Sequence, residues 1–323
     1  MILNKLSASP SRTKRRLVRL AVPAAVVAAL AACSSSSPQS SSTQGAQGTA
    51  SASGSAAASG TASAGSAAET QARALLPSSI KSSGVLTLVS DFEYPPFAMS
   101  DASGNFEGID YDIGSRLAAI LGLKAQWTRS IGFSTLIPAV QSGKAEVAME
   151  DIGINSAREQ VVSFVRYVSN HDTALTAQGN PDHVNPANLC GVTLADQAGD
   201  FEGGVEKQIS AACTAAGKPS IKVSTFPTVP SMVLATKSGR VAGFLEGVPS
   251  CAYDAKQDPT LGCTSNVVPN DTSYAGIAVS KSESQLGEAL AAALKIAQQD
   301  GSYAAILKKW GATAIAATPE FVQ

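Results

Sequence analysis

Carboxylate and aromatic side chains occur in this sequence at positions suited to contact a small polar molecule. Asp91 stands two residues after the end of the apolar run 85–89, VLTLV, and Tyr94 and Phe97 flank two prolines just beyond it. Such a run is typical of a parallel strand covered on both faces, and ligands bind where such strands end. The prolines restrict the backbone and hold both rings in place. Asp91 and Tyr94 are therefore candidate binding residues, although a plain strand and turn explains the same pattern.

Other patterns argue against catalysis and against a bound metal. The sequence contains no nucleophile elbow, Walker motif or GxGxxG motif. It also lacks a Cys-x-x-Cys pair, and its two histidines, His171 and His183, lie outside any metal-ligand spacing. We therefore expect no metal, no cofactor and no catalytic residue.

The cysteines are typical of an exported protein with disulfides. Beyond Cys33 the sequence has an even number of cysteines, at Cys190, Cys213, Cys251 and Cys263. The simplest pairing joins neighbours in the sequence, Cys190 with Cys213 and Cys251 with Cys263. Two other pairings are possible for four cysteines, and the sequence leaves them open.

The N-terminus has the features of a lipoprotein signal peptide. Six basic residues and no acid precede the apolar run 20–32, which has 13 residues and is shorter than the about 20 needed to span a membrane. The run ends in Leu-Ala-Ala-Cys, which resembles the lipobox of bacterial lipoproteins. Residues 1–32 are thus predicted to be removed, and Cys33 to carry a lipid that anchors the protein at the extracellular face of the cell membrane. A buried cysteine after an ordinary signal peptide is the alternative, and Arg15-Arg16 leaves twin-arginine export open.

Residues 33–81 are predicted to form a disordered tether. The stretch from Ser34 to Ala68 has no charged and no aromatic residue, so it cannot form a hydrophobic core. Removal of the signal peptide takes six of the 24 Lys and Arg residues and leaves 18 against 25 Asp and Glu, a formal charge of −7. A chain with this charge is not suited to binding nucleic acid.

The rest of the sequence alternates between strand and helix patterns, which predicts a doubly wound α/β fold. Short apolar runs indicate strands at, for example, 146–149, 173–176 and 241–245. Ser156 and Glu159 have the spacing of a capping box, which predicts a helix that begins at Ser156. Arg158 would then lie in the first turn of that helix, near the end of a strand.

Five segments resemble the extracellular solute-binding proteins of ABC importers, and specifically their amino-acid-binding group. These segments are YPPF at 94–97, GNFEGIDYDI at 104–113, FSTLIPAVQSGK at 133–144, SGRV at 238–241 and DGSYAAILKKWG at 300–311. The resemblance implies two doubly wound α/β lobes with a hinge, of the type II periplasmic-binding-protein kind, and a ligand between them. Lobe 1 would comprise residues 82–171 and 275–323, and lobe 2 residues 172–274. The chain would cross between the lobes near Asn170 to Thr173 and near Asp271 to Ala275.

The resemblance also implies roles for individual residues. Tyr94 and Phe133 match aromatic positions that flank the ligand, and Asp91 matches an acid that can meet a ligand amine. Arg158 matches the arginine that binds the ligand's α-carboxylate, for which a planar guanidinium is well suited. Ordinary core packing is the alternative for Phe133, and a surface ion pair with Glu159 or Asp151 is the alternative for Arg158.

The sequence departs from this family by adding acids around the expected cleft. Glu150 and Asp151 stand where relatives have small hydroxyl residues, and Asp200 stands where they have threonine or serine. Glu246 directly precedes a glycine that occupies the place of a common acid. Together with Asp91, these acids favour a cationic ligand, because like charges in a closing cleft need a cation or bound protons.

Two of these acids have a second explanation. Asp200 suits the N-cap of a helix, and Glu150 is placed to pair with Arg158 or Arg166. Even a capping carboxylate at Asp200 would occupy amide donors that relatives offer to a ligand carboxylate.

The sequence therefore predicts a monomeric, lipid-anchored receptor without catalytic activity. It would capture a small polar nitrogenous solute, an amino acid or related amine with a preference for cations, and deliver it to an ABC permease. One alternative is an enzyme that resembles the periplasmic cyclohexadienyl dehydratases, with Glu150 or Glu246 as the cleft acid. Another is a ligand sensor for a membrane kinase.

Overall fold

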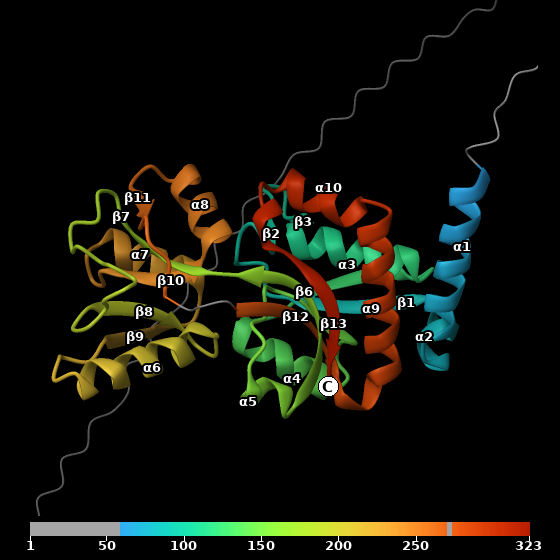
Figure 1. Ribbon diagram of the computed structural model, residues 1–323, viewed down its shortest axis with the longest axis horizontal. Coiled ribbons are helices and arrows are strands. Elements are labelled where there is room, and N and C mark those ends of the chain that lie inside the picture. Colours follow the sequence, from blue (N-terminus) through green and yellow to red (C-terminus); the bar gives the residue numbers. More distant parts are fainter. Residues whose placement is uncertain (1–58, 270–272) are drawn as a thin grey trace, which may run out of the picture. The chain divides into compact units, whose positions relative to one another are not determined.

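The computed structural model describes residues 59–269 and 273–323, with side chains from residue 67 on. The described residues form two α/β lobes, each built on its own sheet (Figure 1). This arrangement confirms the predicted fold class. The predicted signal peptide, the predicted lipidation site Cys33 and most of the predicted tether lie outside the described residues.

Lobe 1 contains a six-stranded sheet. Its strands are β1 (Val85–Ser90), β4 (Lys124–Arg129), β5 (Val147–Ala148), β6 (Val162–Asn170), β12 (Ser273–Ser280) and β13 (Ala316–Val322). They lie in the order β13-β6-β12-β5-β1-β4. β1 is parallel to β4 and β5, whereas β6 is antiparallel to β12 and β13. A small separate hairpin consists of β2 (Met99–Ser100) and β3 (Phe106–Glu107).

Helices cover both faces of this sheet (Figure 1). They are α3 (Ile109–Ile120), α4 (Leu136–Gln141), α5 (Ser156–Glu159), α9 (Ser284–Gln299) and α10 (Ser302–Lys309), with short 3-10 turns at Phe133–Thr135, Lys281–Glu283 and Thr313–Ile315. Leu86 and Leu88 of β1 are buried in a core shared with α3 and α9. Val89 belongs to a second core, which contains Leu136 and Val140 of α4. β1 is therefore a parallel strand with both faces covered, as its sequence predicts.

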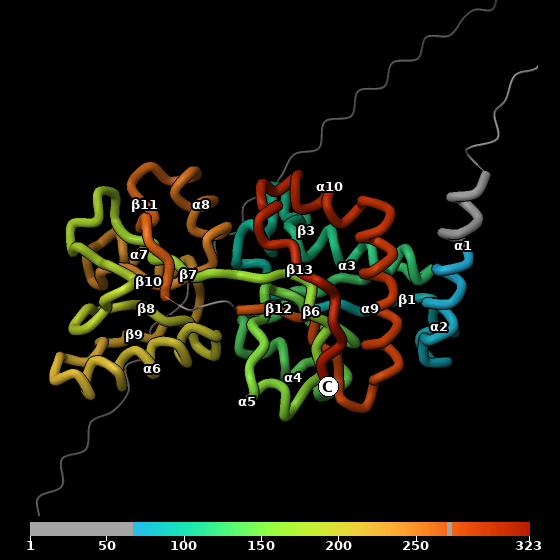
Figure 2. The backbone as a smooth tube through the Cα atoms, in the orientation of Figure 1, coloured from blue at the N-terminus to red at the C-terminus, as the bar shows by residue number. Residues whose placement is uncertain are grey.

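Lobe 2 contains a five-stranded sheet and three helices. Its strands are β7 (Asp172–Ala177), β8 (Thr193–Gln197), β9 (Lys222–Phe226), β10 (Gly243–Gly247) and β11 (Leu261–Cys263), in the order β11-β7-β10-β8-β9. Its helices are α6 (Glu202–Ala215), α7 (Val229–Lys237) and α8 (Val248–Gln257). In Figure 2 the first part of the described chain, coloured blue to green, and its red C-terminal part together form lobe 1. The part between them, mostly yellow and orange, forms lobe 2.

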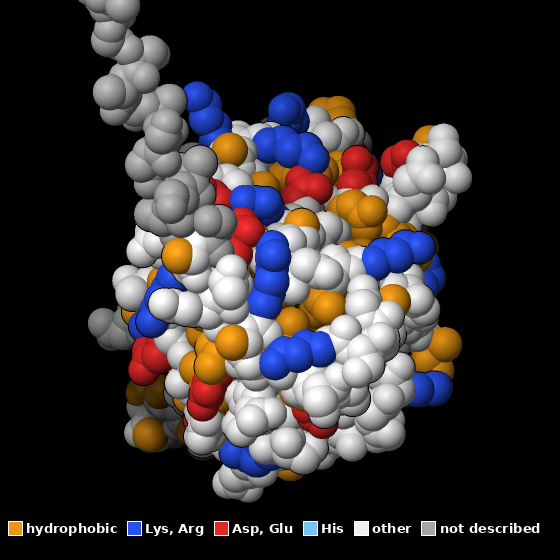
Figure 3. Space-filling view, turned by 90° about the vertical axis from the view of Figure 1, so that its right-hand side faces the viewer, with side chains coloured by type: hydrophobic (Ala, Val, Ile, Leu, Met, Phe, Trp, Pro, Cys, Tyr) orange, Lys and Arg blue, Asp and Glu red, His pale blue; other side chains and the backbone are white. Residues whose placement is uncertain are grey.

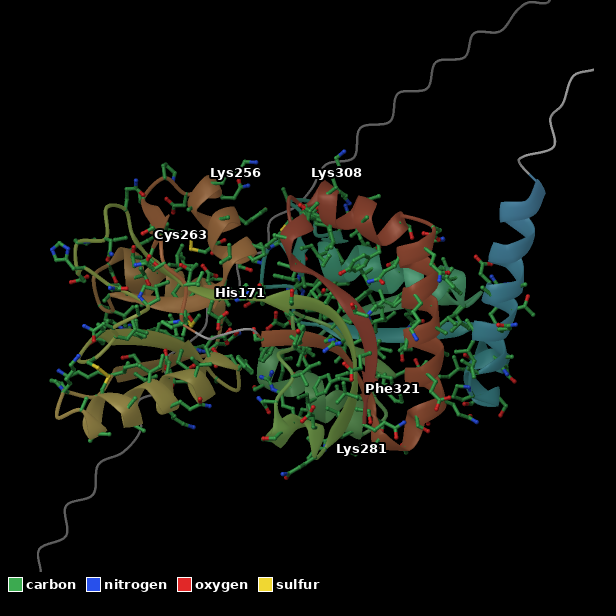
Figure 4. The ribbon with its side chains drawn as sticks, viewed as in Figure 1. His171, Lys256, Cys263, Lys281, Lys308 and Phe321 are labelled. Atoms are coloured by element: carbon green, nitrogen blue, oxygen red, sulfur yellow. A yellow bond between two sulfur atoms is a disulfide. The ribbon has the colours of Figure 1, made fainter. Side chains whose placement is uncertain are left out.

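The chain crosses from lobe 1 to lobe 2 between β6 and β7. Asn170 is the last residue of β6 and Asp172 the first of β7, so the crossing occurs at His171. Figure 4 shows His171 on the segment that joins the two lobes. This crossing falls within the expected range Asn170 to Thr173. The expected return near Asp271 to Ala275 includes residues outside those described.

Both disulfides are the predicted ones and both lie within lobe 2. Cys190 is bonded to Cys213 near the end of α6, and Cys251 of α8 is bonded to Cys263 of β11. The simplest of the three possible pairings is thereby confirmed. Each bridge ties a helix to the β-strand region beside it, and neither connects the two lobes.

The prediction that residues 33–81 form a disordered tether is wrong for its C-terminal part. Helices α1 (Ser59–Ala74) and α2 (Ser78–Ser83) occupy this stretch. Ala72, Leu76 and Ile80 are at most 4% exposed and belong to the core of lobe 1. The alanine-rich composition suggested a chain without a core, but alanine is also the best helix former, and a few apolar residues suffice to attach the helices to lobe 1.

The remote end of lobe 1, seen in Figure 3, has a mixed surface. Lys and Arg side chains are spread over this face, with Asp and Glu side chains among them. Among the helices of the described residues, none is both long enough and apolar enough to cross a membrane.

Candidate functional site

A pocket lies between the two lobes. Its space, including the open mouth, is about 590 Å³. The lining contains six carboxylates, from Glu150, Asp151, Asp172, Asp200, Glu202 and Glu246. It also contains five aromatic rings, from Tyr94, Phe133, Phe201, Phe244 and Tyr274. Among the described residues that line the pocket there is no Lys, Arg or His.

Six of the eight predicted binding residues line this pocket, namely Tyr94, Phe133, Glu150, Asp151, Asp200 and Glu246. Asp91 and Arg158 are not among its lining residues. Asp172 and Glu202 line the pocket but were not predicted. A signal for both was present, since Glu202 is two residues after Asp200 and Asp172 falls within the expected crossing.

Tyr94 is held between the lobes. Its backbone pairs with Ala98 through two hydrogen bonds of 2.9 Å, and its ring stacks on that of Phe97 at 5.7 Å. Its hydroxyl accepts a hydrogen bond of 3.2 Å from the backbone N–H of Gly247, in lobe 2. Burial raises the pKa of Tyr94, and the carboxylates of Asp151 and Glu246 raise it further. The tyrosine thus lies among acids from both lobes.

Glu150 and Asp91 are neighbours at the end of the lobe 1 sheet. Glu150 is 1% exposed, and its carboxylate accepts hydrogen bonds from the backbone N–H groups of Asp91 at 2.8 Å and Glu93 at 3.4 Å. Burial raises the pKa of Glu150, and the Asp91 carboxyl raises it further. Asp91 also accepts a 2.9 Å hydrogen bond from the N–H of Glu93, so its side chain stabilises the turn in which it lies. Its position agrees with the plain-turn interpretation.

Asp151 is held in the left-handed region, with a φ of 46°. Asp110 accepts a hydrogen bond from its N–H at 2.8 Å, and Asn170 donates to its Oδ2 at 2.6 Å. The hydroxyl of Tyr167 in turn donates to Asp110 at 2.5 Å. Oδ1 of Asp151 has no hydrogen-bond partner among the described residues. Burial, and then the charge of Asp110, raise the pKa of Asp151.

Arg158 lies behind the pocket and connects the lobes. Its side chain is buried, and it donates from Nη1 to the Gly153 carbonyl at 2.6 Å and from Nη2 to the Gly199 carbonyl at 2.8 Å. Gly153 belongs to lobe 1 and Gly199 to lobe 2. The guanidinium carbon is 5.5 Å from the ring centroid of Phe133. Burial lowers the pKa of Arg158.

Two expectations about the surroundings of Arg158 are wrong. The helix is not capped by Ser156, because the side chain of Asn155 accepts the bond from the N–H of Arg158 at 2.9 Å, and α5 ends after four residues. Arg158 also forms no ion pair with Glu159, Asp151 or Glu150 within the part of the chain that the structure describes. Backbone carbonyls compete for its donors because the loops bearing Gly153 and Gly199 meet at this point.

Arg166 does not pair with Glu150 either. It forms an ion pair of 2.6 Å with Glu320 of β13, and its guanidinium carbon lies 4.4 Å from the ring centroid of Tyr274. The predicted ion pairs for Glu150 are therefore wrong. Strand β13, which was not predicted, supplies the partner instead.

Asp200 combines both roles that the sequence suggested. Its carboxylate accepts hydrogen bonds of 3.0 Å from the N–H groups of Gln197 and of Gly203, the latter in the first turn of α6. It also lines the pocket. Phe201 is the residue directly before α6, but the Asp200 carboxylate binds the first turn as a capping acid would, so the N-terminus of α6 already has an anionic partner.

Glu246 and Glu202 face the pocket from lobe 2. Glu246 is 2% exposed, and neither of its carboxylate oxygens has a hydrogen-bond partner among the described residues. Burial raises its pKa, and the charges of Asp254 and Asp172 raise it further. Burial raises the pKa of Glu202 too, followed by the charges of Asp172 and Asp200. These acids need a cation or a proton.

The sequence matches a known family of proteins. The family of bacterial extracellular solute-binding proteins, family 3, matches residues 86–313 of this chain. The chain belongs to this family. This match, together with the relatives described next, confirms the predicted resemblance to amino-acid-binding members.

Relatives of this solute-binding protein are named as binding proteins. The arginine-binding protein ArgT of Corynebacterium glutamicum is 25% identical over 246 residues, which cover 75% of this chain and 79% of ArgT. A solved mutant of ArgBP from T. maritima matches with a TM-score of 0.64 and 26% identity, over 72% of this chain and 97% of that one. The ancestral amino-acid-binding protein AncCDT-1, a precursor of cyclohexadienyl dehydratase, matches with a TM-score of 0.62 and 26% identity, over 72% and 97%.

The chemistry of the pocket lining comes from its carboxylates and aromatic rings. In residues 59–269 and 273–323, no group of three or more His, Cys, Asp or Glu side chains has the geometry to hold a metal ion. The pocket instead offers carboxylate oxygens and aromatic faces, which together bind ammonium or guanidinium groups.

Proposed function

We propose that this solute-binding protein captures a small cationic nitrogenous solute and delivers it to an ABC permease. The observation that carries the proposal is the charge of the pocket, which has six carboxylate residues and no basic residue among its described lining. Carboxylates that leave water together repel one another, and a bound cation removes this cost. The aromatic rings add cation–π contacts.

The relatives support the same ligand charge. ArgT is named as an arginine-binding protein, and its similarity extends over 75% of this chain. A second relative, of Neisseria gonorrhoeae, is named as a probable histidine-binding protein. If this chain also prefers basic solutes, that preference agrees with the acidic lining of its pocket.

The delivery part of the proposal concerns the N-terminal residues. Cys33 would carry a lipid at the extracellular face of the membrane, and the segment after it would link the lipid to α1. The protein would act as a monomer, and lobe closure would bury the solute until a permease receives it. No catalytic step is involved.

Cys33→Ser should abolish incorporation of labelled fatty acid and release the protein from membranes, and unchanged labelling would contradict the lipid anchor.

Thermal unfolding of the full chain, purified in mild detergent, tests the ligand charge. Basic, neutral and acidic amino acids and simple amines are added one at a time. A ligand at about 100 times its dissociation constant should add about 2.7 kcal/mol to the free energy of unfolding, which raises the melting temperature measurably. We expect a shift with cations only. A shift with neutral or acidic amino acids but not with cations would refute the proposal.

A further inference from the structure

We propose that the preferred ligand carries at least two cationic nitrogens and no carboxylate, as in a linear diamine or a guanidinoalkylamine. This inference rests on the proposed function and narrows its ligand class. It depends on which hydrogen-bonding groups of the pocket are free and which are already occupied.

Four buried side-chain oxygens of the pocket can still accept hydrogen bonds. Oδ1 of Asp151, Oδ1 of Asn170 and both carboxylate oxygens of Glu246 are buried and have no hydrogen-bond partner among the described residues. Asp151 and Asn170 belong to lobe 1, whereas Glu246 belongs to lobe 2. Because buried acceptors are costly when unpaired, a ligand that donates hydrogen bonds to both lobes would bind best.

The basic side chain beside the pocket is engaged elsewhere. Arg158 touches the ring of Phe133, but its Nη1 and Nη2 donate to the carbonyls of Gly153 and Gly199. Moving the guanidinium to a ligand carboxylate would leave two carbonyls without these donors and would break a link between the lobes. Arg158 thus acts as a latch between the lobes.

The second natural place for an anion is the N-terminus of α6, which points its N–H groups toward the pocket region. Asp200 accepts hydrogen bonds there from Gly203 and from Gln197, each at 3.0 Å. A ligand carboxylate would have to displace this carboxylate or lie beside it. The two carboxylates would then repel each other strongly, because like charges interact more strongly where water is excluded.

The remaining donors in the lining are neutral. The side chains of Gln197 and Tyr274 line the pocket and can each donate a hydrogen bond. Neither supplies a positive charge to offset a ligand carboxylate among six protein carboxylates. A carboxylate is therefore the part of a basic amino acid that this pocket accommodates worst.

The walls suit the carbon chain of such a ligand. Phe133, Phe201, Phe244 and Met232 line the pocket together with the acids. Methylene groups between two nitrogens can pack on these apolar surfaces while the nitrogens meet carboxylates.

Matched pairs of ligands test the inference by isothermal titration calorimetry on the full chain. Agmatine is compared with L-arginine and cadaverine with L-lysine, because the members of each pair differ only in the α-carboxylate. Pentylamine is compared with cadaverine to test the second nitrogen. We expect agmatine and cadaverine to bind at least about tenfold more tightly than the amino acids, and cadaverine more tightly than pentylamine.

A variant of Arg158 separates the latch from a carboxylate-binding role. If Arg158 is a latch, Arg158→Met weakens binding of arginine and agmatine by the same factor. If it binds the ligand carboxylate, the variant weakens arginine about tenfold or more beyond agmatine. Arg158→Lys retains the charge, and it replaces Arg158→Met in this comparison if the methionine variant fails to fold. Lys295→Met removes an exposed positive charge on α9 and is the matched control.

The outcomes distinguish the inference from the function on which it rests. Equal or tighter binding of arginine and lysine than of their decarboxylated partners would overturn the inference and leave the proposed cation receptor standing. Equal binding of pentylamine and cadaverine would overturn the requirement for two nitrogens. Binding of none of these cations, together with binding of a neutral or acidic amino acid, would overturn the proposed function itself.

Discussion

At the scale of single residues, Asp151 shows how strain is placed at the site. A φ of 46° is uncommon for a residue other than glycine and costs of order 1–3 kcal/mol. Asp110 and Asn170 hold this conformation through hydrogen bonds to the backbone and side chain of Asp151. The energy is offset by those contacts, and the result is a carboxylate oxygen that faces the pocket without a partner.

Glu246 permits a direct test of the acidic pocket. Glu246→Gln keeps the shape of the side chain but removes its charge, so we expect affinity for a cationic ligand to fall about tenfold or more, about 1.4 kcal/mol. The melting temperature without ligand should not fall, because an unpaired buried charge does not stabilise the fold. Calorimetry and thermal unfolding measure both effects. Glu288→Gln removes an exposed charge on α9 and should change neither; a similar loss of affinity there would mean that only net charge matters.

At the scale of elements, α1 and α2 extend lobe 1 beyond the family match, which begins at residue 86. Arg73 of α1 reinforces the docking, since its Nε donates to the carbonyl of Ile120 at the end of α3 at 2.8 Å. The lobe therefore begins before its first strand.

Two adjacent leucines test whether this N-terminal extension stabilises lobe 1. Leu76 is 4% exposed and Leu75 is 37% exposed. Leu76→Ala should lower the free energy of unfolding by about 2–4 kcal/mol, because it leaves a cavity in the core. Leu75→Ala should cost less than about 1 kcal/mol. Denaturant unfolding measures both variants, and equal effects would show that the extension does not pack in solution as described.

At the scale of the whole molecule, the two lobes meet through a few close contacts. Gly153 of lobe 1 lies against Phe201 of lobe 2, and a Cβ added at Gly153 would be 2.7 Å from Cδ2 of that ring. The Arg158 latch and the bond from Gly247 to Tyr94 join the lobes nearby. We therefore expect closure over a ligand to depend on the small residue at position 153.

Gly153→Ala should hinder closure without damaging either lobe. We expect the affinity for the cation to fall about tenfold or more, while the melting temperature without ligand stays close to that of the parent. Small-angle scattering should show less compaction on ligand addition than for the parent protein. Gly204→Ala is the control, because a Cβ there meets nothing within 4 Å. Normal compaction by the Gly153 variant would show that the lobes close by another contact.

The acids of both lobes predict a stability that depends on pH. Burial raises the pKa of Asp110 to about 7, and burial together with neighbouring carboxylates raises the pKa values of Asp196 and Glu206 to about 8. The ordinary values are about 4, so between about pH 4 and pH 8 the folded state binds more protons than the unfolded state. The free energy of unfolding must then fall as the pH rises through this window.

Thermal unfolding of the unliganded protein at pH 5, 6.5 and 8 checks this expectation. The melting temperature should be highest at pH 5, and Glu206→Gln should reduce the slope. The affinity for a cationic ligand should change in the opposite direction, because ionised carboxylates bind it better. A melting temperature that increases from pH 5 to pH 8 would contradict the raised pKa values.

Sequence patterns alone predicted the α/β fold, its two lobes through the family resemblance, the observed disulfide pairing as the simplest of three, and six of the residues that line the pocket. These features follow from local patterns, since a buried strand, its terminal acid and a nearby proline pair keep their relation wherever the lobe is placed. Which polar groups remain free to bind a ligand depends on the packing of the two lobes. Arg158 and Asp200 were plausible ligand contacts, yet their side chains are bonded to backbone groups of their own loops or of the facing lobe. Asp91 was a third candidate, but it lies outside the pocket lining and one of its oxygens accepts a bond from the N–H of Glu93. Such partners depend on how two lobes approach each other, and no local pattern encodes that distance.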